Sequence, residues 1–232
     1  MNQTAQSSDT PGAQTTLQRI LDTALEAFAD KGFAGARMDE IARVAGVNKA
    51  TIYYHVGNKA ALYSAVLHRT LGQQAVPFAE AIAQWPTPEE KLRQYVRCIF
   101  ENIQRHPALP RIFMREAASL GAHIPPQAIM DLSGIIGLLT GILNEGREAG
   151  VFIEPTPVLI HFMIVGALGY YAQMEGVLRH RAADPAFNHP PIKTFDTIVG
   201  EVEDLVVNAV RYLPSRTSTP ANVAASPTGG GA

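Results

Sequence analysis

Apolar residues recur along this chain with the three- and four-residue spacing of one face of an α-helix. The first apolar stripe consists of Leu17, Ile20, Leu21, Ala24 and Phe28. It stops at Gly32, and glycine commonly ends helices because it takes the left-handed backbone conformation without steric cost. We find no convincing run of the apolar and polar alternation typical of strands. The spacing therefore predicts an all-α fold.

Glycine, proline and aspartate divide the rest of the chain into further helical segments. Two short helices are expected at residues 38–45 and from Asn48, whose side chain can cap a helix. A longer helix is expected at residues 58–83, and Gly72 and Pro77 within it are expected to bend or break it. The longer expected segments are 58–83, 87–107, 108–119, 126–149, 156–181 and 194–213. The pattern predicts three small helices followed by a larger bundle of about six.

Both ends of the chain are rich in serine, threonine and proline, so we expect residues 1–15 and 214–232 to be disordered. The N-terminal residues lack the apolar stretch of a secretory signal. The most apolar run, residues 157–172, contains His161 and is short for a membrane span, which favours a buried helix. We expect a cytoplasmic protein that does not enter a membrane.

The formal net charge of −2 provides no overall attraction to nucleic acid or to anionic lipid, so any polyanion must bind a local patch. Residues 33–59 form such a patch, because four basic residues there outnumber Asp39 and Glu40. The single cysteine, Cys98, excludes an intrachain disulfide and a cysteine-based zinc site. We expect no metal and no cofactor.

The segment VAGVNKATIYYHVGNK, residues 44–59, crowds two tyrosines, a histidine and two lysines into one short stretch. Gly46 joins two short helices there, and a glycine can take the positive φ of a tight turn. Val47 and Ile52 are then expected to face the first helix of the chain. This arrangement predicts a helix-turn-helix that presents the start of its second helix to the major groove of DNA.

Residues 32–62, GFAGARMDEIARVAGVNKATIYYHVGNKAAL, resemble the DNA-binding domain of the TetR family, the tetracycline-repressor-like transcriptional regulators. The matching positions are Gly32, Phe33, Ile41, Ala42, Ala45, Gly46, Val47, Thr51, Ile52, Tyr53, His55, Val56, Lys59 and Leu62. Three residues differ from those usual in the family: Arg37 replaces a Ser or Thr, Ala50 replaces a Gly or Pro, and Val56 replaces a Phe at its position in the pattern. The resemblance implies a helix-turn-helix DNA-binding domain at 16–62 and a larger effector-binding and dimerisation domain at 63–213.

The predicted DNA contacts are Arg37, Lys49, Ala50, Thr51, Tyr53, Tyr54, His55 and Lys59. The resemblance implies base contacts for Lys49, Ala50 and Tyr54, and sugar-phosphate contacts for Thr51, Tyr53, His55 and Lys59. Arg37 adds a cation for a phosphate. Lysine can donate to a guanine edge, and an alanine methyl can touch a thymine methyl. One alternative is that Tyr53 or Tyr54 packs as a wedge against the first helix.

The last two long helices carry more apolar surface than one core needs, and the family dimerises through such a pair. The predicted homodimer interface comprises Gly166, Gly169, Ile198, Val202, Leu205, Val206 and Ala209. A two-fold dimer would match a palindromic operator in double-stranded DNA. The alternative is that both helices are buried within a monomer.

Bulky, adaptable side chains in the larger domain predict a pocket for a small, apolar effector. The expected pocket residues are Phe100, Ile103, Phe113, Met114, Phe162, Met163, Tyr170 and Met174. His161 and Arg115 are two of the expected polar anchors, although Arg115 has Glu116 and Glu101 as alternative partners. All of these residues could instead be ordinary core.

We therefore expect a DNA-binding transcriptional regulator, a repressor that a small effector releases from its operator. No catalytic residues are predicted, because the chain contains no nucleophile elbow, no glycine-rich phosphate loop and no metal-ligand spacing. Two alternatives remain open. One is an effector-blind DNA-binding or architectural protein, and the other is a helical enzyme of unknown activity.

Overall fold

The computed structural model describes residues 11–182 and 191–212. The elements, in chain order, are α1 (Pro11–Gly35), α2 (Met38–Val44), α3 (Lys49–Val56), α4 (Lys59–Leu67), the π-helix η1 (His68–Gly72), α5 (Ala75–Ala83), α6 (Pro88–Arg105), α7 (Leu109–Ala118), α8 (Pro126–Glu148), α9 (Pro157–Ala182) and α10 (Phe195–Val210). Between these described residues, extended backbone pairs only in one isolated bridge, from Phe152 to Arg211. The predicted all-α fold class is confirmed.

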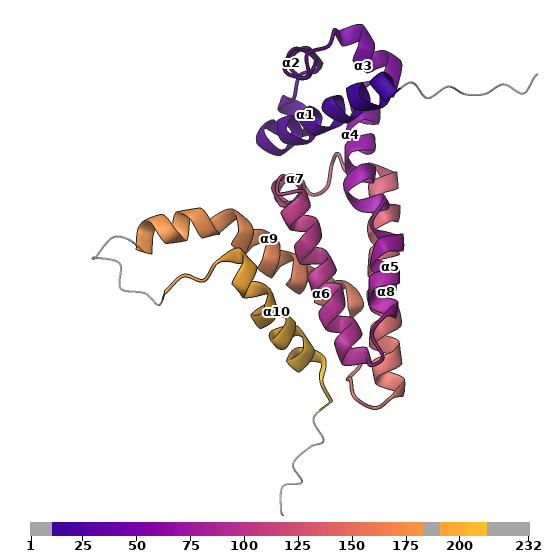
Figure 1. Cartoon of the computed structure of the whole chain (residues 1–232), viewed down its shortest axis with the longest axis vertical. Helices are drawn as coiled ribbons and strands as arrows, with labels where there is room; N and C mark the ends of the chain where they lie inside the picture. Colours follow the sequence, from indigo (N-terminus) through magenta and orange to yellow (C-terminus); the bar gives the residue numbers. More distant parts are fainter. Residues whose placement is uncertain (1–10, 183–190, 213–232) are drawn as a thin grey trace, which may run out of the picture.

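Figure 1 shows α1, α2 and α3 gathered at one end of the molecule, with α4 leading from them into a long bundle of helices. At one side of that bundle, α9 and α10 lean outwards together. We call α1 to α3 the head and α4 to α10 the body. The predicted boundary after residue 62 lies inside α4, so the division into domains at 16–62 and 63–213 stays a prediction.

The head folds around the apolar stripe of α1. Ile20, Ala24 and Phe28 are buried against Ile41 of α2 and Ile52 of α3 in one continuous core. Gly32 has a φ of 70° and breaks the helical backbone inside α1, which is the termination that its position predicts. The helix begins at Pro11, within the segment 1–15 that we expect to be disordered. Proline is accepted in a first helical turn because its missing N–H would have no partner there.

The predicted long helix from Asn58 is divided into three elements. The Asn58 side chain accepts a hydrogen bond from the Ala61 N–H and caps α4. The π-helix η1 follows, and the buried Thr70 hydroxyl donates to the carbonyls of Val66 and Leu67 there. A Cβ atom at Gly72 would lie 2.2 Å from His68 Nδ1, so a larger residue would force that ring to move.

Helix α6 is the central helix of the body. It begins with a capping box, in which Thr87 and Glu90 exchange hydrogen bonds, and Pro88 occupies the first turn. Leu92, Tyr95 and Val96 are fully buried on its inner face. This cap and this stripe are the local reasons why the segment forms a helix that packs against α8 and α10.

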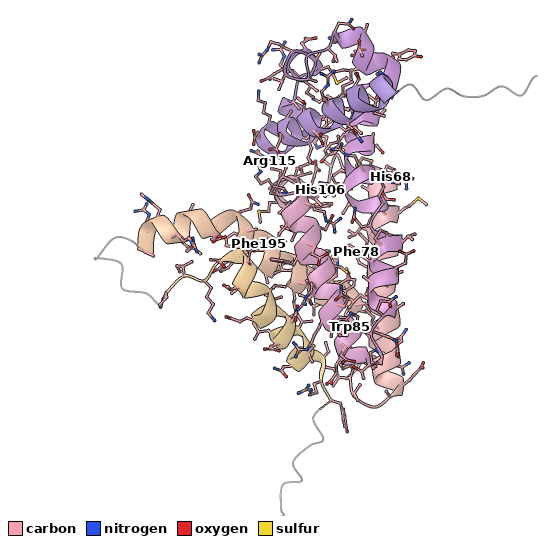
Figure 2. The ribbon with its side chains drawn as sticks, in the orientation of Figure 1. His68, Phe78, Trp85, His106, Arg115 and Phe195 are labelled. Carbon is pink, nitrogen blue, oxygen red and sulfur yellow. The ribbon has the colours of Figure 1, made fainter. Side chains whose placement is uncertain are left out.

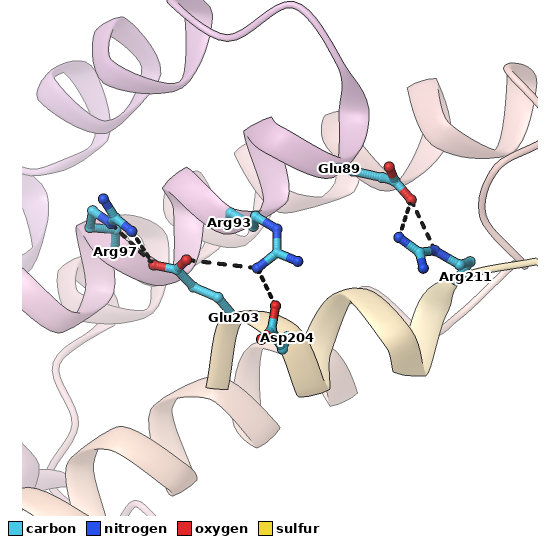
Figure 3. A network of polar contacts seen from close by, with 6 residues as sticks. All are labelled: Glu89, Arg93, Arg97, Glu203, Asp204 and Arg211. Atoms are coloured by element: carbon cyan, nitrogen blue, oxygen red, sulfur yellow. Dashed lines mark hydrogen bonds and ion pairs between the residues drawn. The ribbon is translucent and has the colours of Figure 1, made fainter. Parts of the chain in front are cut away.

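Ion pairs fasten α10 to α6 (Figure 3). Glu203, 5% exposed, accepts hydrogen bonds from the Arg97 guanidinium at 2.8 and 3.1 Å. Arg93 reaches Asp204 at 2.6 Å, and Arg211 reaches Glu89 at 2.9 Å. Because Glu203 is buried, its pairing with arginine is required for this helix packing. The outer face of α10 is thereby held in a fixed orientation.

Two helices, α8 and α9, are long and apolar enough to cross a membrane by length and composition alone. Each helix places part of its apolar surface in the core of the fold, with Ile135 and Leu139 from α8 and Ile160 and Ile164 from α9, although other apolar residues of both helices are exposed. The apolar character of these helices is therefore weak evidence for a membrane span.

Candidate functional site

The turn between α2 and α3 has the geometry that the sequence predicts. Gly46 has a φ of 67°, and the Val47 N–H donates to the Ala42 carbonyl at 3.0 Å. Asn48 caps α3 by accepting a hydrogen bond from the Thr51 N–H at 2.7 Å. Ile52 is completely buried and anchors the inner face of α3. The opposite face of this short helix is therefore held outwards.

The exposed face of α3 brings together most of the predicted DNA contacts. Lys49 and Ala50 are exposed at its start, and Tyr54 is 87% exposed. Tyr53 is 47% exposed, so its ring remains partly packed. Neither tyrosine is therefore a buried wedge against the first helix. The Tyr54 and His55 rings meet edge to face at 5.3 Å. We call Lys49, Ala50, Tyr53, Tyr54 and His55 the ridge, a polar and aromatic surface of the kind that a recognition helix presents to the major groove.

Carboxylates of α2 hold two lysines of the head in place. Lys49 pairs with Asp39 at 2.8 Å, and Lys31 pairs with Glu40. The hydrogen bond and charge of Lys49 lower the pKa of Asp39, and the same contact raises the pKa of Lys49. Arg37 is exposed immediately before α2. The start of α3 therefore offers one cation, Lys49, whose present partner is the solvent-exposed carboxylate of Asp39.

Lys59 has contacts within the protein that its predicted phosphate role did not anticipate. Its ammonium donates to the Ala34 carbonyl at 3.0 Å and lies 4.9 Å from the centre of the Phe33 ring. These contacts join the first turn of α4 to the end of α1. An ammonium has three donors, so a phosphate contact by Lys59 stays a prediction.

A cavity of about 410 Å³ lies in the body between α6, α7, α8 and α9. Its lining is formed by Leu71, Ile99, Asn102, Ile103, Leu109, Pro110, Phe113, Met114, Glu116, Ala117, Gly121, Ile124, Leu132, Ile135, His161, Phe162, Val165, Gly166 and Gly169. The volume and the mostly apolar walls are typical of sites for small organic ligands.

Three buried polar side chains stand in this apolar wall. Glu116 accepts a hydrogen bond from the Tyr63 hydroxyl at 2.9 Å and another from the backbone N–H of His123 at 3.2 Å. Asn102 donates to the Thr70 carbonyl, whereas its Oδ1 atom is buried and has no partner in the structure. His161 Nδ1 lies 2.7 Å from the Tyr95 hydroxyl, and burial lowers the pKa of His161 to about 4. The ring is therefore neutral at pH 7.

Four of the eight expected pocket residues line the cavity: Ile103, Phe113, Met114 and Phe162. Phe100 instead packs against Phe195, with ring centres 4.7 Å apart, between α6 and α10. Met163 and Tyr170 lie on the exposed face of α9, and Met174 is partly buried outside the lining. The structure thus divides the expected set between the cavity, a helix contact and an outer surface.

Sequence reasoning missed Asn102 and Glu116 as cavity residues. Both follow apolar residues at helical spacing, Asn102 three positions after Ile99 and Glu116 four positions after Ile112. A polar residue within a buried stripe is the signal that would have identified them. Arg115, expected as an anchor, lies outside the lining and faces the head.

The expected dimer residues also fall into two groups. Val202, Val206 and Gly169 are buried within the protomer, and a Cβ atom at Gly169 would lie 3.3 Å from Pro110. Gly166, Leu205 and Ala209 are exposed, and Ile198 is half-buried. Helix α9 also exposes apolar residues, which include Leu159, Phe162, Met163, Tyr170 and Val177. We call this exposed surface of α9 and α10 the outer face.

Helix α7 connects the cavity to the head. On one side it lines the cavity with Phe113, Met114 and Glu116. On the other side the Arg115 guanidinium donates to the carbonyls of Ala29 and Asp30, in the last turn of α1 before Gly32. Figure 2 shows Arg115 at this junction between head and body. Arg111 adds ion pairs to Glu26 and Asp30 of α1 at 2.6 and 2.9 Å.

Comparison with protein families gives two matches. Residues 20–66 match the family described as bacterial regulatory proteins, tetR family, and residues 88–187 match a tetracyclin repressor-like C-terminal domain. Together the matched residues make up more than half of the chain. The resemblance carried by residues 32–62 is therefore confirmed, and it extends into the body.

Two relatives are regulators of transcription. The HTH-type transcriptional repressor NicS of Pseudomonas putida is 29% identical over 68% of this chain and 76% of its own length. The HTH-type transcriptional regulator RutR of Escherichia coli is 27% identical over 83% of this chain and 89% of its own length.

Solved structures with the same architecture share less sequence. The transcriptional regulator FadR from Bacillus subtilis, in complex with stearoyl-CoA, has a TM-score of 0.64 at 22% identity and covers 82% of this chain and 97% of its own. A TetR family regulator from Marinobacter aquaeolei has a TM-score of 0.66 at 18% identity, with coverages of 85% and 96%. At these identities the likeness shows the fold alone.

Proposed function

The chain belongs to the TetR family of bacterial regulatory proteins, and on that premise we propose that it is a homodimeric repressor released from a palindromic operator by a small apolar effector. Its relatives regulate transcription, and it is a DNA-binding regulator rather than an enzyme. The cytoplasm, where operator DNA is found, is its proposed location.

For DNA recognition, the proposal rests on the exposed ridge of α3. Lys49, Ala50 and Tyr54 would reach base edges, while Arg37, Thr51, Tyr53, His55 and Lys59 would contact the sugar-phosphate backbone. Lys49 can exchange its exposed partner Asp39 for DNA at small cost, because exposed ion pairs are weak.

For dimerisation, the proposal rests on the outer face of α9 and α10. It exposes several large apolar side chains on two neighbouring helices, namely Phe162, Met163, Tyr170 and Leu205. Large exposed apolar surfaces are typical of protein–protein contacts, whereas single exposed apolar residues are common on any protein. The ion pairs to α6 hold α10 in place, so a partner would meet a rigid surface. Two copies joined here would present two heads to the two halves of an inverted repeat.

Helix α7 carries the effector part of the proposal, because it contacts both the cavity and the head. A ligand in the cavity would touch Phe113 and Glu116, while Arg111 and Arg115 of the same helix hold α1. A ligand that favours one position of α7 therefore changes the balance between two orientations of the head. Release requires only that the effector and the operator favour different states.

A DNA-selection experiment tests the proposed function. Duplexes that the protein selects from a random pool should contain an inverted repeat. Lys49→Ala and Tyr53→Ala should each weaken binding to the selected duplex by about tenfold or more in a gel-shift titration. Lys193→Ala removes the same charge from the body and should change nothing. Unchanged binding by the Lys49 and Tyr53 variants would contradict the assignment of the head.

A second arm distinguishes an effector-responsive repressor from an effector-blind protein. Small molecules that raise the thermal unfolding midpoint of the protein should also lower its affinity for the selected duplex. If such ligands bind without any change in DNA affinity, the effector-blind alternative is correct.

A further inference from the structure

Two polar groups of the cavity wall are hydrogen-bond acceptors, the Glu116 carboxylate and the Asn102 Oδ1 atom. Among the described residues that line the cavity, none is a lysine or an arginine, and Glu116 is the acidic one. Glu116 is 4% exposed, and Asn102 is 5% exposed with an unpartnered Oδ1 atom. His161 supplies no positive charge at neutral pH, because burial lowers its pKa to about 4.

Glu116 receives hydrogen bonds, and within residues 11–182 and 191–212 no cationic group lies within hydrogen-bond distance of it. Its donors are the Tyr63 hydroxyl, the His123 N–H and the Ser119 hydroxyl, the last at 3.5 Å. The nearest recorded basic atom is His123 Nδ1 at 3.8 Å, beyond hydrogen-bond distance. A buried carboxylate in this position is electrostatically incomplete, because buried charges in proteins are normally paired.

The two arginines of α7 do not complete it. Arg111 is directed to the carboxylates of Glu26 and Asp30, and Arg115 to the carbonyl oxygens at the end of α1. Helix α7 therefore presents a carboxylate to the cavity and both guanidinium groups to the head. An anionic ligand would meet Glu116 without a counter-ion, whereas a cationic ligand would supply the missing partner.

We propose that the effector is an apolar molecule bearing a protonated amine, which pairs with Glu116 and donates a hydrogen bond to Asn102 Oδ1. This rests on the proposed function, in which the cavity is the effector site. The apolar part of the ligand would lie against Ile103, Phe113 and Ile135. The ammonium would join the carboxylate that now accepts from Tyr63 of α4, so binding at this point alters a contact between α7 and α4.

Three matched compounds of one shape test the charge of the ligand: 1-naphthylmethylamine, 1-naphthalenemethanol and 1-naphthoic acid. Isothermal titration calorimetry with the full chain should show the amine binding about tenfold more tightly than the alcohol, since charge-assisted hydrogen bonds are roughly twice as strong as neutral ones. The acid should bind weakest. Equal affinities, tighter binding of the acid, or no binding of any of the three at millimolar concentration would overturn the proposal.

Two variants locate the effect. Glu116→Gln keeps an acceptor for the Tyr63 hydroxyl and should reduce the preference for the amine over the alcohol to about twofold or less. Glu101→Gln removes an exposed carboxylate next to Asn102 in α6, outside the cavity. This variant should retain the full preference for the amine over the alcohol. A preference that survives Glu116→Gln would overturn the proposal. If that variant does not fold, the ranking of the three compounds on the wild type decides.

DNA binding separates this proposal from the proposed function. Release of the selected duplex by the amine but not by the acid supports both. Tight amine binding without release would contradict effector-controlled repression and leave the ligand class standing. Release by the acid in preference to the amine would contradict the ligand class and leave the repressor function standing.

Discussion

The head and the body differ in where they keep their polar groups. The buried polar side chains among the described residues are Thr70, Gln74, Asn102, Glu116, His161 and Glu203, and all lie in the body. The described part of the head has an apolar core around Ile20, Phe28 and Ile52, and its charged and hydroxyl groups are at the surface. The polar groups with proposed functions therefore lie at the surface of the head and in the interior of the body.

This difference predicts how each part responds to change. A surface ridge such as α3 can be altered with little effect on folding, because surface substitutions usually change stability by less than about 0.5 kcal/mol. A polar group in the interior of the body is coupled to both folding and ligand binding, since an unsatisfied buried group costs about 1–3 kcal/mol. DNA specificity can therefore change independently of stability, and effector specificity cannot.

The largest expected effect is the acid sensitivity that His161 gives to the body. In the unfolded chain this ring takes up a proton below pH 6.5, but in the folded protein only near pH 4. Stability is therefore fully present above pH 6.5 and falls, by on the order of 3 kcal/mol, as the pH approaches 4. His161→Gln should lose less stability than the wild type between pH 7 and pH 4 in urea unfolding. An identical loss in both proteins would contradict burial of a neutral ring.

A pair of hydroxyl deletions compares interior and surface directly. Tyr63→Phe removes a donor from the buried Glu116 and should lower the free energy of unfolding by about 1–3 kcal/mol. Tyr53→Phe removes an exposed hydroxyl and should leave stability within about 0.5 kcal/mol, while weakening DNA binding. Equal stability losses in the two variants would break the contrast between head and body.

The outer face is an exception to the difference between head and body, because it is a surface of the body to which we assign a function, dimerisation. Leu205→Glu should raise the dimer dissociation constant about tenfold or more, because it places a charge at an apolar contact. Val76→Glu makes the same change at a similarly exposed site on α5 and should leave the dimer intact. Sedimentation velocity across a concentration series measures both. Unaffected dimers in the Leu205 variant would rule out this face.

The smallest expected effect concerns the exposed pair of Asp39 and Lys49. Asp39→Asn frees the Lys49 ammonium and removes a negative charge near the ridge, so DNA affinity should rise roughly two- to fivefold. The gain should shrink as salt is added. Weaker binding by this variant would show that Asp39 positions Lys49 for DNA rather than competing with it.

The head was the more predictable part because its sequence constraints are local. Gly32 and Gly46 have the positive φ angles that their positions indicate, and Asn48 caps α3 as expected. Ile41 and Ile52 are buried as the turn requires. A helix-turn-helix is specified by neighbouring residues, so a short pattern contains most of the information.

The cavity was less predictable because its lining comes from four helices distant in sequence. Helix α9 is apolar nearly all round, so periodicity does not show that Phe162 lines the cavity while Met163 and Tyr170 lie outside it. Phe100 is bulky and inward-facing, yet Phe195 of α10 occupies the space beside it. Asn102 and Glu116 were missed because polar residues are expected at the surface.

Measuring how ligand binding and DNA binding affect each other tests most directly whether the cavity and the head are energetically coupled. The affinity of the tightest-binding naphthalene compound should be measured for the free protein and for its complex with the selected duplex, and DNA affinity with and without that compound. The proposed coupling predicts that both affinities fall by the same factor, about fivefold or more. A ligand that binds free and DNA-bound protein equally would contradict it.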